Sequence, residues 1–344
     1  MTFFIKKKII QAGISKKQKN NPFDYLLAEN YSLPKDADKT INNSYYFSAH
    51  SLSKNQSLYL RLGERIHTEE VWFFYSDSSN TYVYKNLYND KESCPLNIKK
   101  SQDGWKIEFS GECHTLEGEK SQVSFIGEFS SSLSAVDFFS HMPAERTAIA
   151  MAQEKWNKAF FSEVQKNNQV HYEQFGNLKG TLTIDKKETP LSLPTVRDHS
   201  FGKRNWNYMN NHLWLTAVDK NFGLNYSMVS YPSFSMLEVG NVYQKEKGTL
   251  FILKCDLDLN LINTGNIPER LQFNLTLSDK RKIGVSVEKL QHTDYYFQDG
   301  EYLLIEGIAN FDVDGLKVRG ILEIGFNKDK NRWFNGKDLR KIKR

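Results

Sequence analysis

The chain has 344 residues, enough for about two domains, and its 13% of aromatic residues with only 20 glycines and 8 prolines exclude collagen-like, low-complexity and small cysteine-stapled proteins. The net charge of +5 is confined to the ends: residues 1–20 hold six lysines and no acid, residues 327–344 hold eight bases and two acids, and the middle carries 32 bases against 39 acids. Nucleic-acid binding needs a basic folded face, so we expect no nucleic-acid partner and at most weak peripheral membrane contact through the basic N-terminal arm.

Apolar and polar residues alternate along most of the chain. In the first half, Leu58, Leu60 and Leu62 alternate with Tyr59 and Arg61, and similar runs recur after residue 170. A period of two places one face of each strand in a core and the other in water. Asp-Gly pairs at 103–104, 299–300 and 314–315 predict hairpin turns. We therefore predict an all-β fold of antiparallel sheets curled into barrels or sandwiches.

A helical pattern separates two β halves. After Pro143, which suits the first turn of a helix, Ile149, Trp156 and Val164 recur at helical spacing. They predict one amphipathic linking helix. The predicted order is a basic N-terminal arm (1–40), an N-terminal β domain (41–142), the linking helix (143–168), a C-terminal β domain (169–335) and a basic tail (336–344).

The sequence contains no GxGxxG, GxxxxGK[ST], HExxH or GxSxG motif, so we predict no cofactor and no metal. Convergence of His171, His199 and His212 on a zinc ion is the alternative.

The three cysteines, at 94, 113 and 255, are an odd number without a CxxC pair, which is typical of small buried side chains in a reducing compartment. At the N-terminus lysine interrupts every apolar stretch, unlike in a signal peptide. These two features predict a cytoplasmic protein.

Polar and aromatic side chains concentrate between residues 171 and 214. The runs are His171-Tyr172-Glu173-Gln174-Phe175-Gly176, then Arg197-Asp198-His199-Ser200-Phe201-Gly202-Lys203-Arg204-Asn205-Trp206, then His212-Leu213-Trp214. Charged residues in a β protein are costly to bury unless they are paired. We therefore expect Glu173 and Asp198 to pair with Arg197, Arg204 or the imidazoles.

These runs, written HYEQxGxxxGxxxI, RDHSFGxRxW and HxW, resemble motifs of the double-calycin superfamily of carotenoid 1,2-hydratase, AttH-like proteins and fungal Diels–Alderases. The nearest resemblance is to a branch of unassigned function with the motif RDHSWG, where this chain has Phe201 in place of Trp. The segments LRLGER (60–65) and EVW (70–72) also fit, so the similarity covers about residues 44–326. The resemblance implies two lipocalin-like antiparallel β-barrel or half-barrel domains and, in several members, a cavity for a hydrophobic terpenoid or polyketide.

The first functional hypothesis is a cofactor-independent hydratase, cyclase or isomerase acting on an isoprenoid, polyene or lipid. The hydratase carries a functional Asp in a similar D-H-x-x-G stretch, which maps onto Asp198 and His199. Burial can keep a carboxylic acid neutral until it protonates an alkene, and aromatic faces stabilise a cation. Asp198 is thus the predicted general acid, with His199 beside it. The predicted ligand-binding residues are Tyr172, Glu173, Trp206, Tyr208, His212, Trp214 and Tyr226.

The alternative is a non-catalytic lipid carrier or sensor, because an eight-stranded barrel can hold one small ligand. In that case Arg197, Asp198 and His199 form an inter-domain structural lock, with Arg204 and His171 in the same network. The geometry of Asp198 separates the two hypotheses. An Asp198 that faces an apolar cavity favours catalysis, and one that pairs with Arg197 favours the lock.

Overall fold

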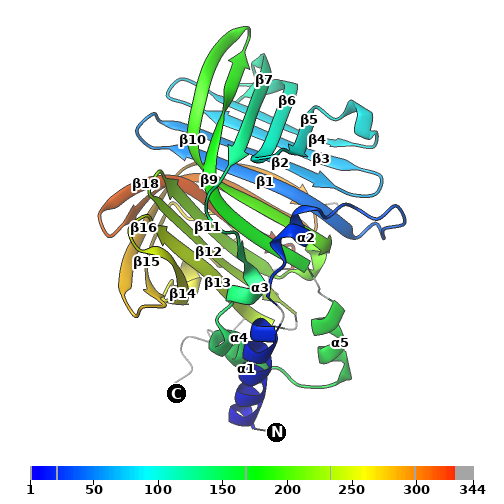
Figure 1. The fold of residues 1–344 in the computed structure, drawn as a ribbon, viewed down its shortest axis with the longest axis vertical. Coiled ribbons are helices and arrows are strands. Elements are labelled where there is room, and N and C mark those ends of the chain that lie inside the picture. Colours follow the sequence, from blue (N-terminus) through cyan, green and yellow to red (C-terminus); the bar gives the residue numbers. More distant parts are fainter. Residues whose placement is uncertain (1, 21, 167–168, 233, 298–299, 330–344) are drawn as a thin grey trace.

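The computed structural model of the chain describes residues 2–20, 22–166, 169–232, 234–297 and 300–329, so the predicted tail over 336–344 lies outside the described residues. Two antiparallel sheets make up most of it, and Figure 1 shows the first sheet above the second. The predicted all-β class is confirmed. No helix in the described ranges is both long and apolar enough to span a membrane.

The first sheet has ten strands in the order β10-β1-β2-β3-β4-β6-β7-β9-β8, with β5 on β6. Because β9 also pairs with β10, the sheet curls into a near-ring. Its strands are β1 (Ile41–Ser51), β2 (Gln56–Glu64), β3 (Glu69–Ser76), β4 (Thr81–Tyr88), β5 (Leu96–Lys100), β6 (Gly104–Thr115), β7 (Lys120–Ser130), β8 (Val136–Asp137), β9 (Gln169–Ile184) and β10 (Lys187–Lys203).

The second sheet is a closed barrel in which each strand pairs with the next and β18 returns to β11. At its last hairpin Asp314 and Gly315 have φ of 49° and 88°, as a tight two-residue turn requires. Its strands are β11 (Asn211–Asp219), β12 (Phe222–Tyr231), β13 (Phe234–Gln244), β14 (Gly248–Cys255), β15 (Arg270–Leu277), β16 (Lys282–Phe297), β17 (Tyr302–Val313) and β18 (Leu316–Asn327). Short 3₁₀ turns occupy Lys91–Ser93, Trp206–Tyr208 and Leu259–Leu261.

The boundary between the sheets lies later in the chain than the predicted domain boundary at residue 169. Strands β9 and β10 follow the helical region but pair with the first sheet, and the barrel begins only at Asn211. The dense segment 171–214 therefore crosses from one sheet to the other.

Strands β1, β2 and β3 are buried on both faces, which corrects the prediction that one face lies in water. Leu58 and Leu60 belong to the interior of the first sheet. Tyr59 and Arg61, expected in water, are 0% and 5% exposed because their face packs against the barrel. There Tyr59 Oη lies 2.9 Å from Tyr295 Oη of β16.

The predicted single helix over 143–168 is two helices, α4 (Ala144–Gln153) and α5 (Lys158–Lys166). The chain breaks between them because Trp156 Nε1 donates to the carbonyl of Met151 at the end of α4, at 2.9 Å. Asn157 Oδ1 then accepts from the backbone N–H of Phe160 at 2.8 Å and starts a new helix.

The predicted N-terminal arm contains two helices, α1 (Phe3–Asn20) and α2 (Tyr25–Glu29). Figure 1 shows α1 beside α4, and Lys7 Nζ lies 2.7 Å from Glu145 Oε1 between them. A further short helix, α3 (Phe138–His141), follows β8. All three cysteines are free thiols; Cys113 and Cys255 are buried, as predicted, and Cys94 is partly buried.

Candidate functional site

Strand β10 places neighbouring residues of the motif on opposite faces of the first sheet. Arg197 lies over the rings of Trp105 and Phe129, which belong to the sheet interior. Asp198 lies across from Tyr46 of β1 in the register, on the face that packs against the barrel. Successive side chains of a strand must alternate in this way, so the predicted network of Arg197, Asp198 and His199 is wrong as a unit.

The interior face holds a buried ion pair between Arg197 and Glu29 of α2. Burial opposes ionisation of Glu29, but hydrogen bonds and charge from Arg197 outweigh it and lower the pKa of that carboxyl. Glu29 also accepts hydrogen bonds from Tyr172 Oη at 2.6 Å and Trp105 Nε1 at 2.9 Å. This network ties the N-terminal region to the first sheet.

His199 belongs to the same interior network and does not line a cavity. Its Nδ1 lies 2.5 Å from Tyr172 Oη and its Nε2 lies 2.8 Å from Asn43 Oδ1. Burial and the neighbouring Arg197 lower the pKa of His199 to about 3, so the imidazole is neutral.

A cavity of about 1270 Å³ lies where the two sheets meet the N-terminal helices. Its apolar lining includes Ile10 and Ile14 of α1 and Leu237 of β13. The residues of the dense segment that line it include His171, Asp198, Arg204, Trp206, Tyr208, His212 and Trp214. Asp198 therefore faces the cavity and does not pair with Arg197.

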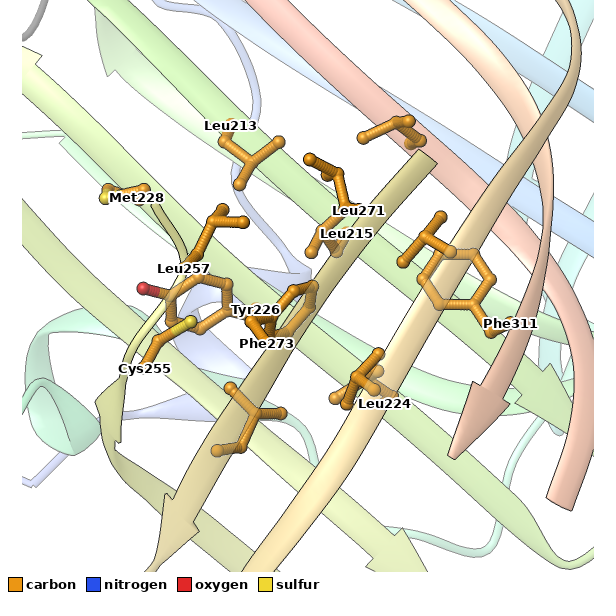
Figure 2. Close-up of a cluster of buried hydrophobic side chains, with 14 of the residues drawn as sticks. Leu213, Leu215, Leu224, Tyr226, Met228, Cys255, Leu257, Leu271, Phe273 and Phe311 are labelled. Carbon is orange, nitrogen blue, oxygen red and sulfur yellow. The ribbon is translucent and has the colours of Figure 1, made fainter. Parts of the chain in front are cut away.

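Three predicted ligand-binding residues, Tyr172, Glu173 and Tyr226, are buried and do not line this cavity. Tyr172 faces the sheet interior, as described above. Tyr226 lies inside the barrel among apolar side chains such as Leu213 and Phe273 (Figure 2). The Tyr226 hydroxyl donates to Glu238 Oε1 at 2.7 Å, so it serves the barrel core.

His171 and Asp198 form an ion pair at the cavity wall. Burial works to lower the pKa of His171, but the carboxyls of Asp198 and Glu173 raise it to about 9. Burial likewise works to raise the pKa of Asp198, but His171 outweighs it and lowers that pKa. Asp198 is therefore ionised at neutral pH. The His171 ring is stacked on Phe138, with centroids 3.9 Å apart.

Glu173 lies behind this pair. Its Oε1 accepts a hydrogen bond from Trp214 Nε1 at 3.0 Å, and His171 Nε2 lies 3.4 Å from the same oxygen. Burial raises the pKa of Glu173 to about 7. Glu173 thus positions one cavity residue of each sheet, His171 and Trp214.

His171, Glu173 and Asp198 bring one nitrogen and two carboxylate oxygens within 4.8 Å of one another, a donor set that could ligate a cation. We assign it as an ion pair, because His171 directly contacts Asp198 and Arg204 already adds positive charge nearby. The alternative of a three-histidine zinc site is wrong, since His199 lies on the opposite face of the sheet.

A pair of buried carboxyls forms the barrel side of the site. Glu306 of β17 and Glu323 of β18 are direct cross-strand neighbours, and Glu323 lines the cavity. Burial raises the pKa of both, and the adjacent Glu323 pushes that of Glu306 well above its usual range. Like charges this close cannot both ionise, so the pair retains a proton at neutral pH.

The carboxyl pair is held by aromatic and imidazole groups. Tyr46 of the first sheet donates to Glu306. His212 Nε2 lies 2.6 Å from Glu323 Oε1, and its Nδ1 lies 2.6 Å from Tyr302 Oη. Burial and the charge of Arg204 lower the pKa of His212 to about 3, so this imidazole is neutral and Nε2–H can donate to Glu323.

A family model described as "Domain of unknown function (DUF7064)" matches residues 28–328. The chain belongs to the DUF7064 family. The matched range of this DUF7064 chain includes Glu29, both carboxyls of the barrel pair and the whole segment 171–214. A comparison with curated proteins found no match.

Three solved structures share the fold of the DUF7064 chain. A protein from Nitrosomonas europaea described as an AttH has 12% identity and a TM-score of 0.53. The match covers 86% of this chain and 96% of the AttH chain. Kievitone hydratase from Nectria haematococca has 11% identity and a TM-score of 0.52, covering 90% and 94%. CghA has 10% identity and a TM-score of 0.50, covering 84% and 88%. The predicted resemblance to AttH-like proteins is confirmed at the level of the fold.

The sequence prediction missed Glu29, Glu306 and Glu323. Glu306 and Glu323 do carry a signal, since each is a single acid within an apolar run, YLLIEGIA and GILEIGF. A charged residue at such a position is costly to bury without a partner. Glu29 gives no comparable signal, because its partner Arg197 is 168 residues away.

Proposed function

We propose that this DUF7064 protein binds a hydrophobic small molecule, an isoprenoid, polyene or lipid, in the cavity between its sheets. We propose further that it converts this molecule by cofactor-independent acid–base chemistry, as a hydratase, cyclase or isomerase. The observation that carries the proposal is the contrast between an ionised Asp198 and a protonated Glu306–Glu323 pair around one cavity. Environments that push carboxyl pKa values apart are typical of acid and base partners. Kievitone hydratase, a hydratase by name, shares the fold.

The proposed roles follow from the protonation states. Because His171 keeps Asp198 ionised, the general acid predicted at Asp198 is reassigned to the carboxyl pair, whose member Glu323 lines the cavity. The pair gives its proton to one carbon of an alkene, which leaves a carbocation on the other. Asp198 and the faces of Trp206 and Trp214 would stabilise that cation.

The cation is then discharged in one of two ways. Water adds to it and passes a proton to Asp198, which completes a hydration. Otherwise a neighbouring C–H bond loses its proton to Asp198, which completes an isomerisation or cyclisation. In both cases solvent returns the proton from Asp198 to the carboxyl pair.

The test is turnover of a panel of terpenoid and polyene alkenes in D₂O, read as deuterium incorporated at carbon. We expect Glu323→Gln to lower the rate by about 10²–10⁴-fold, the usual range for loss of a general acid, and to leave ligand retention unchanged. The control is Glu269→Gln, because the Glu269 side chain is 77% exposed.

Two results would contradict the proposal. Wild-type turnover in Glu323→Gln would remove the carboxyl pair from the mechanism. A protein that retains a lipid through purification but converts none of the panel would be a carrier or sensor, the alternative function.

A further inference from the structure

Arg204 is a partly buried cation of the cavity wall, and no carboxylate contacts it directly. It follows β10 directly, and its backbone N–H donates to the carbonyl of Thr40 at 2.8 Å. Its Nη2 donates to Ser200 Oγ at 2.9 Å, and its guanidinium lies 5.0 Å from the centroid of Trp206. The amide oxygen of Gln169, in the orientation that satisfies both groups, accepts from Nη2 at 2.6 Å and Nε at 2.8 Å.

These partners are all neutral. Among the residues that the structure describes, no carboxylate oxygen lies within 4.0 Å of the Arg204 guanidinium, and the nearby Asp198 pairs with His171 instead. By contrast, Arg61 pairs with Glu70 at 2.7 Å and Arg197 pairs with Glu29. Asp198 acts on Arg204 only through space, because its direct partner is His171.

A charge that is largely withdrawn from water and has no counter-charge in direct contact is unfavourable. Burial lowers the pKa of Arg204 to about 10, which still leaves it charged at neutral pH. The adjacent Lys203 and the nearby Arg61 also line the cavity, so this part of the wall is cationic. A guanidinium offers planar paired donors that fit carboxylate and phosphate oxygens.

The rest of the lining is largely apolar, from Ile9, Ile10 and Ile14 of α1 to Met228 and Leu237 of the barrel. The volume of about 1270 Å³ exceeds the roughly 300–1,000 Å³ of ordinary ligand pockets. The cavity therefore has room for a long apolar body together with a charged head.

We propose that the ligand is an amphipathic acid, whose single anionic head, a carboxylate or a phosphate, binds Arg204 while its apolar body lies along the cavity. This inference rests on the proposed function and narrows its substrate class. An anchored head would also fix which carbon of the body faces the carboxyl pair, because orientation of a bound substrate is itself a large part of catalysis.

The test compares ligands that differ only in the charge of the head. Wild-type protein is titrated with cis-parinaric acid and with its methyl ester, followed by polyene fluorescence, and with farnesyl phosphate and farnesol in competition. We expect at least one acid to bind about tenfold or more tightly than its neutral counterpart, as for a hydrogen bond to a charged group. A larger preference within the parinaric pair indicates a carboxylate head, and a larger preference within the farnesyl pair indicates a phosphate head.

Variants then locate the head. We expect Arg204→Gln to remove the preference for the acid without weakening the neutral ligand, and Arg204→Lys to restore part of it, since it keeps the charge but not the paired donors. Arg270→Gln, at an exposed pair with Glu288, is the matched control.

Equal affinity for charged and neutral ligands in the wild type would overturn the inference and leave the hydrophobic cavity function intact. Binding of neither class would overturn both. An acid preference that persists in a folded Arg204→Gln protein would also overturn the assignment. Because the ligand comparison uses the wild type, it decides the question even if that variant does not fold.

Discussion

At the scale of single residues, the alternation of β10 decides what each neighbour in the motif does. Arg197 and His199 face the sheet interior, where Arg197 pairs with Glu29 and the His199 imidazole is hydrogen-bonded and buried. Asp198 faces the cavity instead. The largest contribution that keeps Asp198 ionised against its burial then comes from one contact, His171, on the adjacent strand β9. Two residues that are neighbours in sequence thus have unrelated environments.

We expect His171 to titrate near pH 9 in histidine NMR spectra and His199 to stay neutral above pH 5. In Asp198→Asn the titration of His171 should move to lower pH, because the charge that holds the imidazolium is gone. The folded pKa of His171 lies above its unfolded value of 6.5, so the pair stabilises the fold fully below that value and loses this contribution as the pH rises through about 9. Titration of His171 near pH 6.5 in the wild type would contradict the ion pair.

At the scale of elements, the five-residue helix α2 is fixed to the first sheet by side chains, not by its own length. Asp24 Oδ1 accepts from the backbone N–H of Leu27 at 2.9 Å and caps it. Glu29, at its last position, is 4% exposed and joins Arg197, Tyr172 and Trp105. An isolated helix this short is unstable in water, so the buried network determines where it lies.

We expect Arg197→Met to lower the free energy of unfolding by about 3–5 kcal/mol, because it leaves the Glu29 carboxylate buried and unpaired. The double variant with Glu29→Gln should recover much of this loss. Denaturant unfolding measures both. Arg270→Met, at an exposed ion pair, should cost at most about 1 kcal/mol. A double variant no more stable than the single one would show that the two residues are not coupled.

At the scale of the whole molecule, the cavity exists because two curled sheets and an N-terminal helix meet without filling the space between them. The interface between the sheets is well packed where Trp72 stacks on Tyr295, with centroids 3.7 Å apart. Further along, α1 covers the cavity through Ile10 and Ile14, although none of its residues is fully buried. Helix α1 therefore contributes little to the hydrophobic core, and its main structural effect is to cover one side of the cavity.

Removal of residues 1–20 should therefore leave both sheets folded and lower the melting temperature by only a few degrees. It should weaken binding of an apolar probe about tenfold or more, because the probe loses its buried apolar contacts with α1. A loss of about 1.4 kcal/mol of binding free energy corresponds to a tenfold weaker affinity. Thermal unfolding and ligand titration of the same preparation measure the two effects. Unchanged affinity in the shortened chain would show that α1 does not enclose the ligand.

The sequence by itself determined the β class, because a period of two is a local consequence of strand geometry, and it determined turns such as Asp314-Gly315, where φ must be positive. It also located the segment that crosses between the sheets and its cavity residues Asp198, Trp206, His212 and Trp214. Only the tertiary structure decided that Asp198 faces away from Arg197 and that Tyr226 lies in the barrel. The tertiary structure also identified Glu29, Glu306 and Glu323 as parts of the two buried networks. Sheet register brings together side chains that are far apart in the chain, and no local sequence pattern indicates which strands will be neighbours.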